Sequence, residues 1–306
     1  MNNTQPKSDI RHGEAPLSTC NSEISSNTPV TYPENAIRVL DKGFVRLVDV
    51  MGDDSSIVQA ARVSYGQGTK SVSQDEGLIR YLMRHKHTTP FEMVEFKFHC
   101  RMPIFVARQW IRHRTASVNE VSGRYSEMPD WFYVPSQELC TTQSAQNKQG
   151  GTGEQIEGSA AASESFRSTQ SEIYEQYQQY ISSNMRRELA RINLPLSMYT
   201  EWYWKIDLHN LLHFLALRLD AHAQYEIRVF AEAMAEIVKQ YVPLAWKAFS
   251  DYRLGGMALS GQEIELIKQL LNGQKIDIDG TMPTKREAKE FRDKLAELGV
   301  SSPEAT

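Results

Sequence analysis

Residues 94–100 alternate strictly between apolar and polar side chains, and this pattern constrains the fold more than any other part of the chain. Val94, Phe96, Phe98 and Cys100 form one set, and Glu95, Lys97 and His99 form the other. Because successive side chains of a strand point to opposite faces, we predict a strand with one apolar face. Pro103 follows at a position that the first turn of a helix tolerates, so residues 104–111 are expected to continue as a helix.

Other segments predict further strands and helices. Two β-type runs at residues 37–40 and 44–50 flank Asp41-Lys42-Gly43, which indicates a hairpin. Asp207 is a suitable N-cap for one long helix that reaches about Tyr241. Shorter helices are expected at residues 76–85 and 168–191, and two amphipathic ones within residues 260–306.

Three segments lie outside the main domain, which we place at residues 32–256. Residues 1–31 are rich in Asn, Ser, Thr and Pro and are expected to form a disordered tail. Residues 137–165 are of low complexity and predict a mobile surface insertion. Residues 257–306 are expected to form a C-terminal helical extension.

Composition excludes several classes of protein. The chain has 306 residues and a net charge of −4, which argues against a generally basic nucleic-acid binder but not against a local basic site. The sequence has no run of about 18 apolar residues and no secretory pattern at its start, so neither a membrane span nor export is expected. Cys20, Cys100 and Cys140 are far apart without a CxxC motif, which fits a reducing compartment and predicts a cytoplasmic protein.

The densest group of chemically active side chains is residues 108–125, RQWIRHRTASVNEVSGRY. It holds Arg108, Arg112, Arg114 and Arg124. Arginine binds phosphate through a planar fork and stacks on aromatic rings. On an ideal helix, the side chains of two residues that are two positions apart in the sequence point about 200° away from each other. Arg112 and Arg114 therefore serve two ligand regions, or the chain leaves the helix there.

Two alternatives for this arginine cluster stay open. It could be a solvated, salt-bridged basic face, because charge clusters usually lie on the surface. It could also be a platform for single-stranded nucleic acid, with Trp110 and Tyr125 stacking on bases. In the phosphate-binding interpretation, the loop Ser122-Gly123-Arg124 could converge backbone N–H groups, a hydroxyl and a guanidinium on one anion.

A second group is His87-Thr88-Thr89-Pro90-Phe91-Glu92, which by itself fits a structural turn equally well. A third is the helix DLHNLLHFLALR from Asp207, on which Arg218 falls beside the leucine stripe. A guanidinium there needs a carboxylate partner or a buried ligand. His209 and His213 have the spacing of metal ligands but lack a third one, so no metal site is predicted.

Together these segments resemble the flavin-dependent thymidylate synthase family. Arg112-His113-Arg114, Ser117 and the Ser122-Gly123-Arg124 loop match the family signature in full. The preceding HTTPFE and the later DLHNLLHFLALR match in family order, and the resemblance covers residues 36–252.

The resemblance implies an α+β fold, with long helices packed around a twisted, mainly antiparallel sheet. It implies a homotetramer with active sites at subunit interfaces. The implied reaction is the reductive methylation of dUMP to dTMP. Methylenetetrahydrofolate supplies the carbon and FAD, reduced by NADPH, supplies the hydride. Neither nucleic acid nor a membrane is an implied partner.

The resemblance also implies roles for individual residues. Arg218 would be catalytic, because a cation beside the uracil edge favours ionisation of N3. Attack by Ser122 on the base is a less favoured alternative, since no base activates its hydroxyl. Arg191 is expected to reach the nucleotide across an interface. The implied FAD-binding residues are Thr89, Arg112, His113, Arg114, Glu120, Asp207, Leu208, His209 and His213. The implied dUMP-binding residues are Gln109, Trp110, Ile111, Arg112, Glu120, Val121, Ser122, Gly123, Arg124, Arg191 and Arg218.

Overall fold

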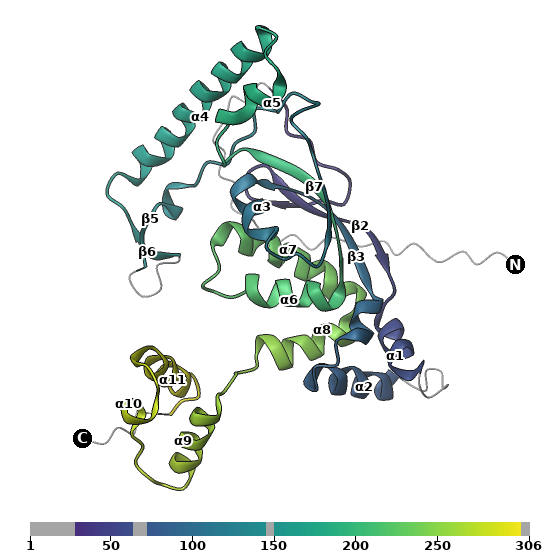
Figure 1. Ribbon diagram of the computed structural model, residues 1–306, viewed down its shortest axis with the longest axis vertical. Helices are drawn as coiled ribbons and strands as arrows, with labels where there is room; N and C mark the ends of the chain where they lie inside the picture. Colours follow the sequence, from purple (N-terminus) through teal and green to yellow (C-terminus); the bar gives the residue numbers. More distant parts are fainter. Residues whose placement is uncertain (1–27, 64–71, 145–149, 301–306) are drawn as a thin grey trace, which may run out of the picture.

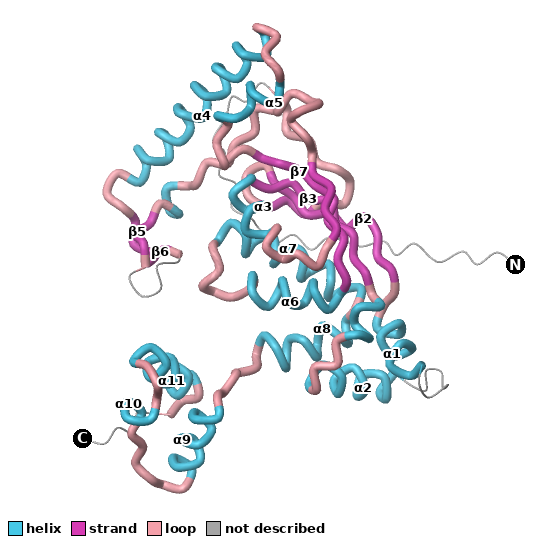
Figure 2. The backbone as a smooth tube through the Cα atoms, viewed as in Figure 1, coloured by secondary structure: helices cyan, strands magenta, loops and turns pink. Residues whose placement is uncertain are grey.

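A five-stranded antiparallel sheet forms the centre of the computed structural model, which describes residues 28–63, 72–144 and 150–300 (Figure 1). The strand order is β1-β2-β3-β7-β4, and the sheet is twisted (Figure 2). Its strands are β1 (Ile37–Val39), β2 (Gly43–Met51), β3 (Glu95–Pro103), β4 (Ser117–Glu120) and β7 (Tyr199–Asp207). The expected α+β architecture is confirmed.

The alternating pattern of β3 divides the sheet into an apolar and a polar face, as predicted. Phe98 pairs with Trp204 in the register with β7, and both side chains are fully buried in the main core. On the other face His99 Nε2 lies 2.6 Å from Glu201 Oε1. Glu201 also accepts a hydrogen bond from Arg101 Nε at 3.0 Å. Charged residues therefore pair on the face that the core does not use.

The predicted hairpin joins β1 to β2 through a required glycine. A Cβ on Gly43 would lie 2.7 Å from the carbonyl oxygen of Val39 and 2.8 Å from that of Arg101. Only a residue without a side chain allows this close approach of three backbone segments.

Helices cover the apolar face of the sheet and one end of it (Figure 1). Asp207 caps α6 as predicted, accepting the N–H of Asn210 at 3.0 Å. The elements are α1 (Asp54–Arg62), α2 (Val72–Arg84), η2 (Thr89–Met93), α3 (Ile104–Trp110), α6 (Leu208–Arg218), α7 (Tyr225–Tyr241), α8 (Pro243–Phe249) and η5 (Ser250–Leu254).

The prediction of one helix from Asp207 to Tyr241 is wrong, because a turn separates α6 from α7. The Asp220 side chain accepts the backbone N–H of His222 at 2.7 Å, which competes with helical hydrogen bonding. Arg228 Nη1 donates to the carbonyl oxygen of Ala221 at 2.9 Å and holds the turn against α7.

Residues 137–165 are more ordered than predicted. They contain η3 (Gln137–Leu139), a hairpin of β5 (Thr141–Gln143) with β6 (Gly151–Gln155), and the first turns of α4 (Ser159–Ser182). Residues 145–149 of the predicted insertion lie outside the described residues. Two short helices, α5 (Arg187–Ala190) and η4 (Arg191–Asn193), follow α4. A small core around Tyr177 and Met128 anchors this part of the chain.

The predicted disordered tail is too long at its C-terminal end. The carbonyl oxygen of Thr31 accepts a hydrogen bond from Arg101 Nη2 at 3.0 Å. That of Thr28 accepts one from Trp131 Nε1 at 3.1 Å. Residues 28–31 therefore bind to the main body, while residues 1–27 of the predicted tail lie outside the described residues.

The C-terminal extension has its own core, separate from the main one. It comprises α9 (Gly261–Leu271), α10 (Ile278–Thr281) and α11 (Lys285–Glu297), which lie together at the C-terminal end (Figure 1). Leu266, Phe291 and Leu295 are buried within it. Lys294 Nζ lies 2.7 Å from Glu263 Oε1 and ties α11 to α9. The two predicted amphipathic helices are confirmed. Within the described residues, no helix is long and apolar enough to cross a membrane.

Candidate active site

The helix α3 ends at Trp110, so the side chains of the residues that follow it do not point in the directions that a helix would impose. The backbone N–H of His113 donates to the carbonyl oxygen of Trp110 at 3.0 Å and turns the chain toward β4. Arg112 and Arg114 consequently line the same cavity, of about 560 Å³. Of the two alternatives for these arginines, departure from the helix is the one observed.

The second wall of this cavity is the exposed edge of α6. It contributes His209, His213 and Arg218, three of the residues that the sequence singled out. The cavity therefore gathers side chains from two segments about a hundred residues apart in the chain. Its other lining residues are Thr115, Ile206, Asn210 and Leu217.

The cavity is strongly cationic. Its lining includes three arginines and three histidines and no aspartate or glutamate. Among the described residues, no carboxylate forms an ion pair with Arg112, Arg114 or Arg218. Uncompensated guanidinium groups in one concave site attract a ligand that carries negative charge. Arg112 and Arg114 are exposed, so they fit the solvated part of the basic-face alternative, but none of the three arginines has the salt bridges which that alternative includes.

Arg218 is held by a neutral histidine instead of by an acid. Its Nε donates to Nε2 of His113 at 3.2 Å. Burial, together with the charge of Arg218 and the proximity of His213, lowers the pKa of His113 to about 4. The imidazole is therefore uncharged at neutral pH and can accept this hydrogen bond. Burial also lowers the pKa of Arg218, but an arginine remains protonated.

The Phe214 ring fixes the orientation of this histidine. The His113 ring stands edge-on to Phe214, with centroids 4.9 Å apart, and the ring of His213 lies 6.1 Å away. Phe214 in turn stacks on the buried ring of Trp110, with centroids 5.1 Å apart. The core thus sets the position of His113, which leaves the two Nη groups of Arg218 available to a ligand.

Of the loop Ser122-Gly123-Arg124, Arg124 lines a different hollow. A Cβ on Gly123 would lie 3.2 Å from Cδ of Arg191 and 2.7 Å from Sδ of Met128, so Arg191 packs against this loop within the same chain. The charged residues that line this hollow are Arg124, Arg186, Arg187 and Glu188, so positive charge is in excess there. The loop therefore forms a second cationic region, in which Arg124 and Arg191 are neighbours of Gly123.

Ser122 is not placed as an activated nucleophile. Its Oγ accepts the backbone N–H of Arg124 at 3.4 Å. No imidazole or carboxylate within residues 28–63, 72–144 and 150–300 forms a hydrogen bond with it. Glu120 is also engaged, since its Oε1 accepts the hydroxyl of Thr200 at 2.6 Å. Glu120 and Val121 line a further cavity on the polar face of the sheet.

Some predicted site residues contribute to the scaffold. The side chains of Trp110 and Leu208 are fully buried, so only their backbones can face a ligand. Ile111 is partly buried and packs against the same core. The side-chain amide of Gln109 donates to that of Gln224. The burial of Trp110 also removes one of the two rings that a nucleic-acid platform would need.

Sequence reasoning missed several residues that line the arginine cavity. Asn210 donates through Nδ2 to Asp207 Oδ2 at 2.7 Å, which occupies the carboxylate predicted to contact the cofactor. Asn210 precedes His213 by three residues, so helical periodicity places the two side chains on the same face of α6. The sequence therefore contained the signal for this residue. Within the described residues, no group of three His, Cys, Asp or Glu side chains could hold a metal.

Residues 46–244 match the model of the family described as Thymidylate synthase complementing protein. A relative from Ehrlichia ruminantium (strain Gardel), named flavin-dependent thymidylate synthase, is 52% identical over 91% of this chain and 96% of its own length. This chain belongs to the flavin-dependent thymidylate synthase family.

Another member of the flavin-dependent thymidylate synthase family, from Ruegeria pomeroyi, is 55% identical over 83% of this chain and 86% of its own length. A solved structure of PolB from Streptomyces cacaoi, described as a UMP/dUMP methylase bound with 5-Br dUMP, superposes with a TM-score of 0.64. It is 34% identical, over 71% of this chain and 98% of PolB. The family resemblance seen in the arginine motif thus extends through the whole main domain.

Proposed function

We propose that this chain is a flavin-dependent enzyme that methylates dUMP to dTMP, with methylenetetrahydrofolate as carbon donor and NADPH as reductant. The overall reaction is dUMP, methylenetetrahydrofolate, NADPH and a proton giving dTMP, tetrahydrofolate and NADP⁺. The observation that carries the proposal is the convergence of Arg112, Arg114 and Arg218 in one cavity whose lining has no carboxylate. Family membership and the relatives' printed names support it.

The residues of this cavity fit FAD. A flavin dinucleotide carries an anionic pyrophosphate, and Arg112, Arg114 and His209 offer donors with no competing acid in the lining. Thr89 begins η2, which contacts α6, and its side chain is exposed; we propose that it also contacts the flavin. When bound, the reduced flavin supplies the hydride that completes the methyl group. The protein binds and orients the reactants.

Arg218 is the proposed catalytic residue. Its guanidinium, oriented by His113, would lie at the uracil edge and lower the pKa of N3. An opposite charge within about 4–6 Å typically shifts a pKa by about 1–3 units. That shift corresponds to roughly 1.4–4 kcal/mol of stabilisation of the ionised form. The anionic ring is a better carbon nucleophile at C5. No cysteine nucleophile is needed.

The second cationic region would bind the phosphate of dUMP. Gly123 and Arg124 offer a backbone N–H and a guanidinium, and Arg191 packs against this loop. Because this region and the arginine cavity are separate hollows in one chain, we propose that each active site is completed between subunits of a homotetramer. The free cysteines Cys100 and Cys140 suit the cytoplasm as the compartment.

The test is spectroscopic and chemical. The purified protein should be yellow, or become so with FAD, and NADPH should bleach its visible absorbance. With all cosubstrates it should release tritium from dUMP labelled at C5 and form dTMP. A protein that binds no flavin under any of these conditions would refute the proposal.

A further inference from the structure

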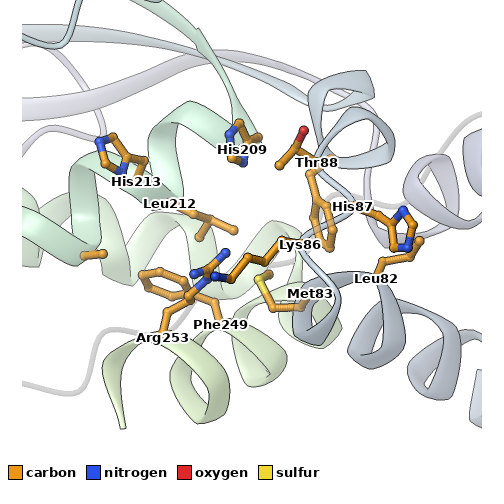
Figure 3. A pocket seen from close by; sticks show the side chains of 12 residues that line it. Leu82, Met83, Lys86, His87, Thr88, His209, Leu212, His213, Phe249 and Arg253 are labelled. Carbon is orange, nitrogen blue, oxygen red and sulfur yellow. The ribbon is translucent and has the colours of Figure 1, made fainter. Parts of the chain in front are cut away.

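The cationic hollow at the C-terminal end of α4 differs from the cavities around α6. The cavity between α6, the end of α2 and η5 has a largely apolar wall and shares His209 and His213 with the arginine cavity, so it adjoins the proposed flavin site (Figure 3). The α4 hollow has a volume of about 380 Å³, and among the described residues it shares no lining side chain with either. Its charged lining residues are Arg124, Arg186, Arg187 and Glu188.

A left-handed turn brings two arginines to this hollow after α4 ends. Asn184 has a φ of 59°, a conformation that asparagine tolerates at the end of a helix. The N–H of Met185 donates to the carbonyl oxygen of Tyr180 at 3.0 Å and closes the turn. Arg186 and Arg187 follow directly, at the start of α5, which lies beside the end of α4 (Figure 1). Backbone geometry therefore places both arginines.

Hydrogen bonds to α4 fix the loop that carries Arg124. The N–H of Met128 donates to the hydroxyl of Tyr177 at 3.0 Å. The hydroxyl of Tyr174 donates to the carbonyl oxygen of Met128, also at 3.0 Å. Met128 and Tyr177 are buried together in the small core of this region. The hollow is thus formed by two anchored segments, one on each side.

The arginines of this hollow lack acidic partners. In the part of the chain that the structure describes, Arg124, Arg186 and Arg187 form no ion pair. Arg124 donates to the hydroxyl of Tyr125 at 3.0 Å, which leaves its charge uncompensated. Glu188 is the one carboxylate in the lining. The C-terminal end of α4 favours cations, but its partial charge of about −0.5 compensates less than one arginine.

A monophosphate uses only part of this positive charge. A phosphate monoester carries about −1.5 to −2 charge at pH 7, and Gly123, Arg124 and Arg191 are the partners proposed for that of dUMP. Arg186 and Arg187 line the same hollow as Arg124 and have no ligand group assigned to them. Because guanidinium groups pair well with phosphate oxygens, these two arginines suit further phosphates joined to the first one.

We propose that this hollow binds the outer phosphates of a pyrimidine deoxynucleoside triphosphate, which thereby competes with dUMP. The α-phosphate takes the place of the dUMP phosphate at Gly123 and Arg124, and the β- and γ-phosphates contact Arg186 and Arg187. The triphosphate made from the product dTMP is a ligand of this class, so its accumulation slows the enzyme. This inference rests on the proposed function, because it uses the phosphate site proposed there for dUMP.

The test compares ligands with different numbers of phosphates. Calorimetry on flavin-loaded protein, without divalent cations, folate or NADPH, measures the affinities for dUMP, dUDP and dUTP and for dTMP and dTTP. We expect each triphosphate to bind about tenfold more tightly than its monophosphate. Salt screens exposed charges, so this preference should shrink when the salt concentration is raised from about 0.1 M to 1 M.

A double variant and a matched control locate the outer phosphates. Arg186→Gln/Arg187→Gln should bind monophosphates and triphosphates with affinities within about threefold of each other. Arg167→Gln removes another arginine of α4, which pairs with Glu164 and does not line the hollow, and it should keep the native preference. Glu188→Gln removes the carboxylate of the lining and should strengthen binding of dTTP about twofold.

Steady-state kinetics test the competition. dTTP should raise the KM for dUMP and leave kcat unchanged, because the two nucleotides share one phosphate site. A fall in kcat at constant KM would contradict the inference, since it would place the triphosphate at a different site.

Equal affinities of the native protein for monophosphates and triphosphates would overturn the inference. A preference that persists in the double variant would also overturn it, because other residues would then bind the outer phosphates. If the thermal midpoint shows that the double variant does not fold, unchanged dTTP affinity in Glu188→Gln would refute the assignment. The proposed function fails separately, through absence of dTMP formation by the native protein. A native protein that forms dTMP but binds dUTP no more tightly than dUMP would refute only this inference.

Discussion

The Nε of Arg218 donates to Nε2 of His113 at 3.2 Å and connects the last residue of α6 to the turn after α3. The contact joins the two segments that carry the family signature. The contact also requires that His113 be neutral, because only an unprotonated imidazole nitrogen can accept the hydrogen bond. Arg218 is thereby oriented without a carboxylate that would compete with an anionic ligand.

Arg218→Ala should retain bound flavin and lose methylation. Loss of a positioned charge that acts in the transition state typically costs about 10²–10³ in kcat, and we expect a loss of that order in dTMP formation. Arg286→Ala, an exposed residue of α11, is the control for loss of one arginine. Near-native turnover by Arg218→Ala would show that another group activates the pyrimidine.

Substitutions at His113 separate orientation of Arg218 from its charge. Gln at this position offers an amide oxygen as acceptor for the Arg218 Nε–H, whereas Leu offers none. We expect His113→Leu to lower kcat about tenfold and His113→Gln to recover part of that loss. Flavin content, read from visible absorbance, shows whether the site remains intact. Equal kcat values for the two variants would contradict an orienting role for the hydrogen bond.

Protonation of His113 should oppose folding in acid. Its folded pKa of about 4 lies below the ordinary value of 6.5, so between these pH values the unfolded chain binds more protons. Its contribution to stability is therefore complete above about pH 6.5 and falls as the pH drops toward 4. Comparison of urea midpoints for native protein and His113→Gln from pH 7 to 4.5 measures it. The native midpoint should fall more steeply; parallel curves would exclude the effect.

Arg124→Ala should weaken binding of dUMP while leaving flavin content unchanged. A guanidinium–phosphate contact contributes about 1.5–3 kcal/mol, so we expect Kd to rise about tenfold or more. Gly123→Ala should have a related effect, because the added Cβ meets Met128 and Arg191. Equilibrium binding of dUMP to the flavin-loaded protein is the measurement. If Arg124→Ala binds dUMP normally, the phosphate site lies elsewhere.

Phe291→Ala should destabilise the C-terminal extension and leave the main domain folded. Phe291 is fully buried in a core formed by residues 266–295 alone. Truncation of a buried phenylalanine costs about 3–5 kcal/mol. Hydrogen exchange should therefore accelerate in α9 and α11 only. Faster exchange throughout β3 and β7 would mean that the two cores unfold together.

The sequence predicted those features that local periodicity or a single residue determines. The alternation at residues 94–100 specified β3 and its buried face, and Asp207 specified the start of α6. The break between α6 and α7 was missed, because the apolar stripe continues across it. Only the hydrogen bond from His222 N–H to Asp220 reveals why the helix ends there.

Five residues that line the arginine cavity were named from the sequence, but their contacts were not predicted. Arg112, Arg114, His209, His213 and Arg218 were all named from the sequence, and the structure gathers them in one cavity. Helical spacing could not show that the chain turns at Ile111. Nor could it show that the partner of Arg218 is an imidazole, since contacts between segments about a hundred residues apart depend on the packing of the core.

The most direct measurement is a crystal structure of the flavin-loaded protein with dUMP. The account predicts the uracil edge within about 3 Å of the Arg218 guanidinium, with His113 still accepting from Nε. It also predicts the flavin pyrophosphate against Arg112 and Arg114. A nucleotide bound away from Arg218, with that guanidinium facing solvent in every subunit, would contradict the account.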